Sequence, residues 1–338
     1  MNGRSLAGAL SPRIIGTLRA SGVAFLLVLL CHHPAAAEAC GFVYTVGSNS
    51  FQSFDLPAGC SPSGINDGGQ IVGSTGNGLP QGFIKDGNTF TTFNVPGANF
   101  TELSDINNVG QIVGLHGPGG RAFSTDGTTI TSYDYPGAIF TYAFGINDNS
   151  QIVGKYRIEI VLGPGPSPGS IVVQDFDHAL VIDGPIITSF DVPGARDTAA
   201  FGINNAGQIV GTWDEGIPGI SHGFLKYRDT LLSFDYPGAL STSATGINDS
   251  GVIVGTYSDA NNHFHGFIKD GDTFASLDFP DSQFTFANGI NNLGQVVGSY
   301  SPTPHPPPFL PEPATILLVG CGLLAIWATT GGKSSARN

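Results

Sequence analysis

Apolar and polar positions alternate along the chain in short runs that repeat about every 40 residues. Four such runs occur within one repeat, and in one copy they are Ser243–Asn248, Val252–Tyr257, His265–Gly271 and Thr273–Pro280. Each run is bounded by Asn, Asp, Gly or Pro, the residues that favour turns. Alternation over runs this short is typical of β-strands rather than helices. The pattern therefore predicts an all-β fold in which each repeat supplies four strands.

One phrase shows the period of the repeat directly. Gly-Ile-Asn followed by Asp or Asn occurs five times, and a looser copy with Asp in place of Gly starts at Asp105. The isoleucine of the phrase falls at Ile65, Ile106, Ile146, Ile203, Ile247 and Ile290, so the spacings are 41, 40, 57, 44 and 43 residues. A period of roughly 40 residues with four strands is typical of a propeller blade. The longest spacing contains Arg157–Asp175, which we predict to form an extra hairpin that projects from one blade.

The order of the strand motifs at the two chain ends predicts a closed ring. The chain begins with third- and fourth-strand motifs in Gly41–Pro57 and ends with a second-strand motif in Gln295–Tyr300. The N-terminal hairpin can therefore complete the last blade, which removes exposed strand edges. We predict a six-bladed β-propeller over residues 40–300, closed by pairing of the N- and C-terminal strands. An open solenoid or a sandwich is the alternative, but the terminal units lack the capping repeats of a solenoid.

Composition and charge narrow the class of partner. The 338 residues include 49 Gly and 23 Pro, and 13 basic against 26 acidic residues give a net charge of −13. A nucleic-acid partner is not expected, because it requires a basic face that meets phosphates. The sequence also lacks H-E-x-x-H, P-loop and cysteine-based zinc motifs.

The N-terminal segment has the features of a secretory signal peptide. Three arginines precede the apolar run Gly22–Leu30, and the small residues of Pro34–Ala39 follow it. This order of a basic region, a short apolar region and an A-x-A site predicts cleavage after Ala37 or Ala39. Residues 1–39 are therefore expected to direct export, and the apolar run is too short for a confident membrane span.

Export changes the interpretation of the four cysteines. Cys31 leaves with the signal peptide and Cys321 lies in a C-terminal apolar segment, so Cys40 and Cys60 remain as a pair. The two bracket the predicted first hairpin, whose open ends lie close together. We predict a disulfide between Cys40 and Cys60 in the oxidising compartment, the alternative being two unpaired thiols.

The repeat phrases resemble those of the HAF family of bacterial extracellular repeats. The phrases are "GINDGGQIVG" from Gly64, "HGFIKDG" from His265 and "FDVPGA" from Phe190, and the resemblance covers about Gly41–Tyr300. It implies an extracellular repeat protein. No defined activity follows from it, because the family carries none that can be transferred.

The C-terminal segment resembles a PEP-CTERM sorting signal. A Pro-rich spacer over residues 301–310 leads to Pro311, Glu312 and Pro313, then to an apolar run from Ala314 to about Thr330 and two separated basic residues. The resemblance implies that residues 311–338 hold a short transmembrane helix and are recognised by an exosortase-type enzyme in a Gram-negative bacterium that makes exopolysaccharide. Two departures are the missing arginine cluster and Cys321 within the helix. A plain C-terminal membrane anchor is the alternative, at the short limit for spanning.

Candidate metal ligands are few. His263 and His265 alternate on one predicted strand and could share a face as metal ligands, but an isolated pair lacks a third ligand. His178 and His222 occupy the same place in the repeat as His265, which favours a structural role. Recurrent Asp residues could bind Ca²⁺, yet they also suit the turns in which they lie. We therefore expect no cofactor.

Five non-repeated polar residues are the candidates for catalysis, but nothing ties them into an acid/base pair and ordinary surface variation is the favoured interpretation: Glu102, Glu159, Glu215, Asp214 and Arg196. Glu102 and Arg196 are predicted to lie in the segments that connect one blade to the next. The expected function is that of an exported, non-enzymatic binding or structural protein of the cell envelope or exopolysaccharide matrix. Its expected partners are the sorting enzyme and an exopolysaccharide or envelope proteins. A secreted hydrolase or lyase with a site at the central channel, or a Ca²⁺-dependent adhesin, is the alternative.

Overall fold

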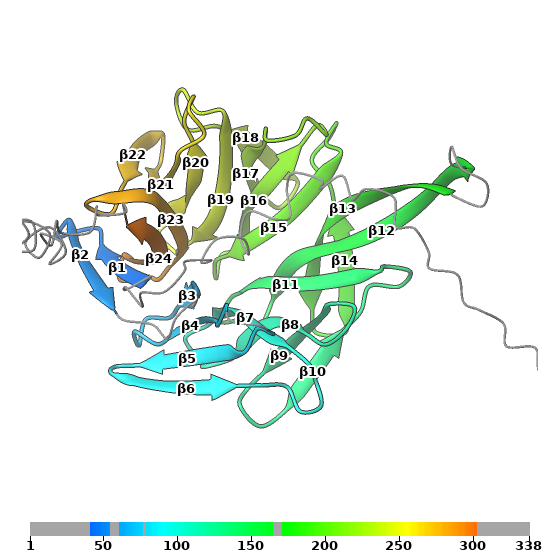
Figure 1. Cartoon of the computed structure of the whole chain (residues 1–338), viewed down its shortest axis with the longest axis horizontal. Helices are drawn as coiled ribbons and strands as arrows, with labels where there is room; N and C mark the ends of the chain where they lie inside the picture. Colours follow the sequence, from blue (N-terminus) through cyan, green and yellow to red (C-terminus); the bar gives the residue numbers. More distant parts are fainter. Residues whose placement is uncertain (1–40, 55–60, 77–78, 165–170, 303–338) are drawn as a thin grey trace, which may run out of the picture. The chain divides into compact units, whose positions relative to one another are not determined.

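A computed structural model describes residues 41–54, 61–76, 79–164 and 171–302. Within these residues the chain forms 24 strands and no helix. The strands make six four-stranded antiparallel sheets that follow one another around a ring (Figure 1). The predicted all-β, six-bladed propeller is therefore confirmed.

Blades 1 to 5 are each built from four consecutive strands. Blade 1 contains β3 (Ser61–Ile65), β4 (Ile71–Ser74), β5 (Gly82–Asp86) and β6 (Thr89–Phe93). Blade 2 contains β7 (Thr101–Ile106), β8 (Ile112–His116), β9 (Arg121–Thr125) and β10 (Ile130–Tyr133). Blade 3 contains β11 (Phe140–Ile146), β12 (Ile152–Pro164), β13 (Ile171–Asp183) and β14 (Ile186–Phe190). Blade 4 contains β15 (Asp197–Ile203), β16 (Gln208–Asp214), β17 (His222–Tyr227) and β18 (Thr230–Phe234). Blade 5 contains β19 (Ser241–Ile247), β20 (Ile253–Ser258), β21 (Phe264–Asp270) and β22 (Thr273–Leu277).

Blade 6 is shared between the two ends of the propeller chain. It contains β23 (Ser282–Ile290), β24 (Gln295–Pro302), β1 (Gly41–Thr45) and β2 (Ser50–Phe54), in the spatial order β2-β1-β24-β23. The register between β1 and β24 runs from Gly41 opposite Ser299 to Thr45 opposite Gln295. The predicted closure by the N-terminal hairpin is confirmed, because β1 fills the edge that β24 would otherwise expose.

The asparagines of the repeated phrase join the blades into a closed ring of hydrogen bonds. The side-chain amide of each donates to the backbone carbonyl of the same asparagine in the next blade, at 2.9–3.3 Å. This asparagine ring consists of Asn66, Asn107, Asn147, Asn204, Asn248 and Asn291, all buried. The last link, from Asn291 to Asn66, joins the C-terminal part of the chain to the N-terminal part. The phrase therefore supplies contacts between blades as well as turns within them.

The residue after each ring asparagine forms a second ring in which Asp and Asn alternate. Each backbone N–H donates to the side-chain oxygen of the equivalent residue in the next blade, at 2.8 Å in all six cases. In ring order the members are Asp67, Asn108, Asp148, Asn205, Asp249 and Asn292. Alternation gives every carboxylate two amide neighbours, whereas six aspartates would place like charges side by side. This explains why the phrase reads Asn-Asp and Asn-Asn in turn.

The glycine of the Ile-Val-Gly run allows a phenylalanine from the third strand to lie against the second. A Cβ atom at Gly211 would approach the Ala199 carbonyl oxygen to 2.0 Å and the ring of Phe224 to 2.7 Å. The ring of Phe224 is completely buried. The same arrangement recurs at Gly73, Gly255 and Gly298 with Phe83, Phe267 and Phe42. Close packing, rather than a turn, therefore requires glycine here.

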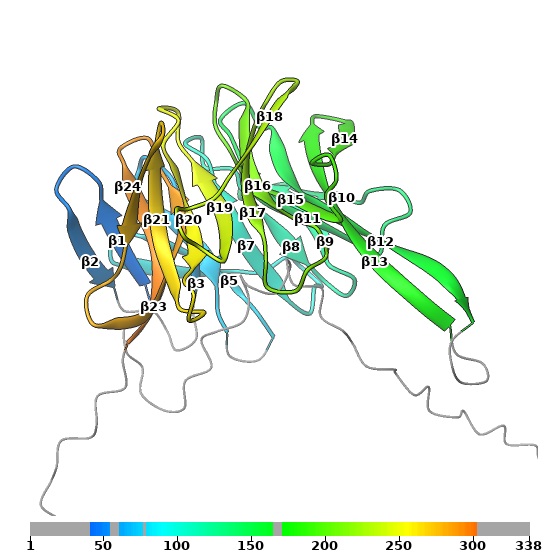
Figure 2. The same cartoon turned by 90° about the horizontal axis from the view of Figure 1, so that it is seen from above.

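Blade 3 departs from the other blades by its length. Strands β12 and β13 have 13 residues each and stay paired as far as Pro164 opposite Ile171. Strand β11 accompanies β12 only as far as Arg157. Residues 158–164 and 171–176 thus form a two-stranded ribbon, named the ribbon from here on, which extends beyond the neighbouring strands (Figure 2).

Candidate functional site

Three of the histidines belong to a motif that repeats between blades. His222 and His265 lie at or next to the start of the third strand, and His178 has the equivalent place within the longer β13. Each contacts an aspartate 13 residues later, and its ring lies 4.7–5.1 Å from an aromatic ring of the second strand. The pairs are His178–Asp191 at 2.9 Å, His222–Asp235 at 3.0 Å and His265–Asp278 at 2.8 Å. Repetition at one structural position indicates that these pairs support the blade.

The candidate metal ligands His263 and His265 both lie near Asp259. The distances from their ring nitrogens to Oδ2 of Asp259 are 3.6 Å and 3.9 Å. Within the described part of the chain, no group of three or more His, Cys, Asp or Glu side chains is arranged to hold a metal ion. Asp259 is therefore the acidic neighbour that the two histidines share.

The predicted features at the two chain ends lie outside the described residues. These are the signal peptide, the cysteines Cys40 and Cys60, the spacer and the sorting residues Pro311, Glu312 and Pro313. Across the residues that are described, no helix has the length and apolar character needed to cross a membrane.

A buried charge cluster joins blades 3 and 4 at the base of the ribbon. At its centre, Asp177 on β13 pairs with two cations of β12. Lys155 Nζ lies 2.9 Å from Oδ2 of Asp177, and Arg157 donates from Nε and Nη2 at 2.7 and 2.8 Å. Burial alone raises the pKa of Asp177, but the hydrogen bonds from Arg157 and the charge of Lys155 outweigh it, so the pKa is lowered. Asp177 is therefore ionised and fixes the two cations in place.

A second part of the cluster comes from blade 4. Asp197 and Asp214 are directly opposite each other on β15 and β16 and are 2% and 3% exposed. Oδ1 of Asp197 accepts the backbone N–H of Asp177 at 2.8 Å, and Oδ1 of Asp214 accepts the N–H of Gly216 at 2.6 Å. Arg196 lies beside them, with Nη1 3.6 Å from Oδ2 of Asp197. The cluster thus links the ribbon strand β13 to blade 4 through side chains.

Three buried polar atoms of the cluster have no hydrogen-bond partner among the described residues. They are Oδ2 of Asp197, Oδ2 of Asp214 and Nε of Arg196. Burial, with the charge of Asp197 as a further cause, raises the pKa of Asp214 to about 6. Burial also raises the pKa of Asp197. Two such carboxyl groups side by side favour holding a proton at mildly acidic pH.

The sequence-based candidates fall into two groups. Asp214 and Arg196 come together, since the backbone N–H of Arg196 donates to the carbonyl of Asp214 at 2.7 Å. Reading Asp214 as surface variation was wrong, because its side chain is buried. Glu102 lies within β7, not in a connecting segment as predicted, and burial raises its pKa. Glu159 and Glu215 are exposed.

Sequence reasoning missed Lys155, Asp177 and Asp197 as members of the cluster. The signal was the placement of Lys155 and Arg157, and of Asp175 and Asp177, two residues apart in otherwise apolar strand segments. Side chains two residues apart share a face of a strand. Once β12 and β13 pair, the two cations of one strand and the two carboxylates of the other therefore lie on the same face of the hairpin.

Asp105 is a partly buried acid outside the charge cluster that the sequence reasoning did not single out. It replaces the glycine of the repeated phrase, and neighbouring inner strands approach closely there: a Cβ at Gly202 would lie 3.1 Å from Gly246 Cα. Its carboxylate accepts the N–H of Ile106 at 2.9 Å and that of Ile146, in the next blade, at 3.1 Å. Burial nonetheless raises its pKa to about 7.

Replacing Asp105 with Asn is expected to reduce the pH dependence of stability. The pKa of Asp105 is raised from its ordinary value of 3.8 to about 7 in the folded protein, so the folded state binds a proton that the unfolded state has lost between these values. Stability therefore falls as pH rises across that window, by on the order of 4 kcal/mol at most. Thermal unfolding at pH 5 and pH 8 should show a smaller decline for Asp105→Asn than for the parent. An equal decline in both would contradict this assignment.

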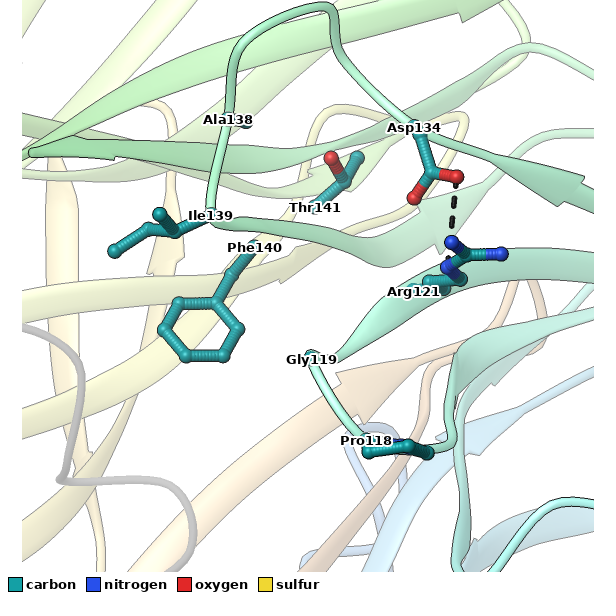
Figure 3. Close-up of a pocket in the computed structure, with 8 residues that line it drawn as sticks. All are labelled: Pro118, Gly119, Arg121, Asp134, Ala138, Ile139, Phe140 and Thr141. Atoms are coloured by element: carbon teal, nitrogen blue, oxygen red, sulfur yellow. Dashed lines mark ion pairs between the residues drawn. The ribbon is translucent and has the colours of Figure 1, made fainter. Parts of the chain in front are cut away.

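A shallow hollow of about 210 Å³ lies between blades 2 and 3 (Figure 3). Arg121 and Asp134 form an ion pair at 3.6 Å on one side of it, with Ile139 and Phe140 on the opposite side. The ion pair has the 13-residue spacing of the His–Asp pairs and is more than half exposed, so it contributes little to stability. The hollow therefore belongs to the repeated pattern of the blades rather than to the charge cluster.

Comparison with known proteins bears on the fold alone. No protein-family profile matches the chain, and no curated protein matches it significantly. Among solved structures, a protein assigned as TolB from Agrobacterium tumefaciens has a TM-score of 0.56 and 9% identity, covering 80% of this chain and 100% of that one.

Two further solved structures are similar at TM-scores below 0.5. The β-propeller domain of the Trilobed protease from Pyrococcus furiosus has a TM-score of 0.42 and 9% identity over 71% of this chain and 87% of that one. Trypanosoma rangeli sialidase has a TM-score of 0.37 and 11% identity over 84% and 59%. Identities this low say nothing about activity.

Proposed function

We propose that this β-propeller protein is exported and acts as a non-catalytic binding or structural protein of the cell envelope or its surrounding matrix. The N-terminal basic and apolar segments support export, and the resemblance of the C-terminus to a sorting signal supports placement at the envelope. In this proposal the ribbon is the contact surface.

The observation that carries the proposal is the exposure of aliphatic side chains on the ribbon. Ile160, Val161 and Leu162 on β12 are 44%, 57% and 59% exposed, and Val173 on β13 is 40% exposed. Among the described strands, none pairs with the ribbon beyond Arg157. Exposed apolar side chains on a projecting strand pair are typical of surfaces that bind a partner. They favour a protein surface over the exopolysaccharide that the sequence suggested.

The charge cluster supports this role because it fixes the ribbon before a partner arrives. Asp177 lies at the ribbon base, and its backbone N–H is held by Asp197 of blade 4. Arg196 also donates to the backbone carbonyl of Asp175 at 3.2 Å. A binding element held in one position loses less conformational entropy on association.

Burial of the acidic pair supports a non-catalytic role over the hydrolase alternative. A hydrolase needs carboxyl groups that reach the substrate. Asp197 and Asp214 have the raised pKa values that such an enzyme would use, yet they are 2% and 3% exposed. Their contacts within the cluster account for them as anchors of the ribbon.

Trimming the ribbon tests the proposal. Residues 160–174 are replaced by Asn-Gly, which closes a two-residue turn on Glu159 and Asp175, residues already directly opposite each other. We expect a native far-UV spectrum but release of the trimmed protein from the envelope and matrix fraction of the producing bacterium into the medium, by about fivefold or more. The double variant Val109→Ser, Leu293→Ser alters exposed apolar residues elsewhere and should keep the parent distribution.

The same experiment separates a protein partner from a polysaccharide. The purified parent protein should not co-sediment with protein-free exopolysaccharide, because aliphatic side chains gain little binding free energy from a sugar surface. Co-sedimentation that trimming abolishes would assign the polysaccharide as the partner instead. Unchanged retention of the trimmed protein in cells would exclude the ribbon as the contact surface.

A further inference from the structure

The geometry points to a proton-operated latch at the ribbon base: Asp197 and Asp214 share a proton at mildly acidic pH, and its loss loosens the attachment of the ribbon to blade 4. This inference stands on the charge cluster and does not depend on the proposed function. It assigns a regulatory device to two side chains that the sequence did not connect.

The orphaned oxygens are the first support for a shared proton. Asp197 and Asp214 are cross-strand partners, and each uses Oδ1 for a backbone N–H while Oδ2 has no hydrogen-bond partner among the described residues. Oδ2 of Asp197 has only the longer ion-pair contact with Nη1 of Arg196, at 3.6 Å. A buried acceptor left unpaired costs free energy. One proton taken from solvent removes one of two adjacent buried negative charges and relieves the cost of leaving both of them ionised.

The surroundings do not already neutralise the pair. The ionisable side chains on the elements packed around it are Lys155, Tyr156, Arg157 and Glu159 on β12, Asp175, Asp177, His178 and Asp183 on β13, Arg196 before β15, Glu215 after β16, His222, Lys226 and Tyr227 on β17, and Tyr142 on β11. Lys155 and Arg157 bond to Asp177, so they are not free to pair with Asp197 or Asp214. Strand β19, which packs against β15 and β16, has no ionisable side chain in its sequence. Arg196 is left as the nearest cation, at 3.6 Å from Asp197.

The departure from the repeat is the second support. Position Asp197 opposite Asp214 corresponds to Phe140 opposite Arg157 in blade 3 and to Ser241 opposite Ser258 in blade 5. Neither equivalent places two acids together. The pair is therefore specific to the junction that carries the ribbon.

Deprotonation acts on the ribbon through the bonds that Asp197 and Arg196 make. Asp197 holds the backbone N–H of Asp177, and Arg196 holds the carbonyl of Asp175. When both carboxyl groups are charged, their repulsion disfavours the positions in which these bonds form. Because the pKa of Asp214 is raised to about 6, the latch is closed below this value and loosens above it.

Hydrogen exchange of the exported protein at pH 5 and pH 7.5 tests the latch. After correction for the intrinsic exchange rate, amides in 173–178 and 196–199 should be about tenfold less protected at pH 7.5. Amides of β5 in blade 1, far from the cluster, should show no such change. Asp214→Asn should abolish the pH effect at the ribbon base, and Asp105→Asn should leave it intact.

Two results would overturn the inference. One is equal protection of the ribbon base at both pH values in the parent protein. The other is an Asp214→Asn variant that keeps the parent's pH dependence. If Asp214→Asn does not fold, Asp197→Asn provides the same comparison, since either substitution removes one of the two groups that share the proton.

Discussion

Deletion of residues 41–54 is expected to make the protein aggregate or unfold far below the melting temperature of the intact chain. The deletion removes β1, which pairs with β24 over five residue pairs, and exposes the edge of β24. It also removes Phe42, which is completely buried, and Tyr44, both part of the blade 6 core. Loss of one buried Phe alone costs about 3–5 kcal/mol. Size-exclusion chromatography and thermal unfolding would measure the effect.

Replacing Cys40 and Cys60 with Ser is the matched control for the deletion. The predicted disulfide would contribute on the order of 3 kcal/mol in the chain-entropy model. The double Ser variant should therefore lose less stability than the deletion variant, because the pairing of β1 with β24 survives. A deletion variant that stayed monomeric with an unchanged melt would mean that the blades form an open array.

Asp177→Asn is expected to cost about 3–5 kcal/mol of unfolding free energy. The substitution leaves Lys155 and Arg157 without their shared carboxylate, and Lys155 is 3% exposed. Removing one partner of a buried ion pair strands an uncompensated charge, which is strongly destabilising. Urea unfolding of both proteins at pH 7 would give the difference.

Asp175→Asn is the control for the Asp177 substitution. Asp175 lies 4.0 Å from Arg157 and is 39% exposed, so its replacement should cost less than about 1 kcal/mol. Equal and small effects of the two substitutions would mean that the cluster does not hold the ribbon base. A large effect confined to Asp177 would support the buried pairing.

The acids of the protein act on stability in opposite directions. The lowered pKa of Asp177 means that its contribution is present above the unfolded value and is lost as pH falls through the folded one. The raised pKa values of Asp105 and Asp214 mean that the protein loses stability as pH rises towards 7. The combined effect places maximal stability at mildly acidic pH rather than at neutrality.

The blade count and the closure could be predicted because they depend on local information. Alternation along each strand, the turn residues between strands and the order of motifs at Gly41 and Gln295 are all read within a few residues. The observed bounds of β19 and β20, for example, lie within about two residues of the predicted ones.

The contacts between blades could not be predicted in the same way. Asn66 and Asn107 are 41 residues apart, and their hydrogen bond exists only once the blades are neighbours. The alternation of Asp and Asn in the second ring was visible in the sequence, but it acquires a physical reason only when consecutive repeats are adjacent in space.

The charge cluster shows the same limit for the candidate site. Asp177, Asp197 and Asp214 come from different strands, and the sequence does not state that β13 and β15 pack together. Asp214 was therefore grouped with exposed residues such as Glu215. Asp105 differs, because its substitution for the repeated glycine was visible, and only the close approach of the inner strands shows how little space surrounds its side chain.

A cysteine pair across the closing strands is the most direct test of the ring. Val43 and Val297 are cross-strand partners, so the variant Val43→Cys, Val297→Cys should form an intramolecular disulfide that peptide mass spectrometry detects. The control variant Val43→Cys, Val296→Cys places the second cysteine on the opposite face of β24 and should not form it. A ring closed by β1 predicts the bond in the first variant alone and within one molecule. Absence of the bond, or its formation only between molecules, would contradict the closed propeller.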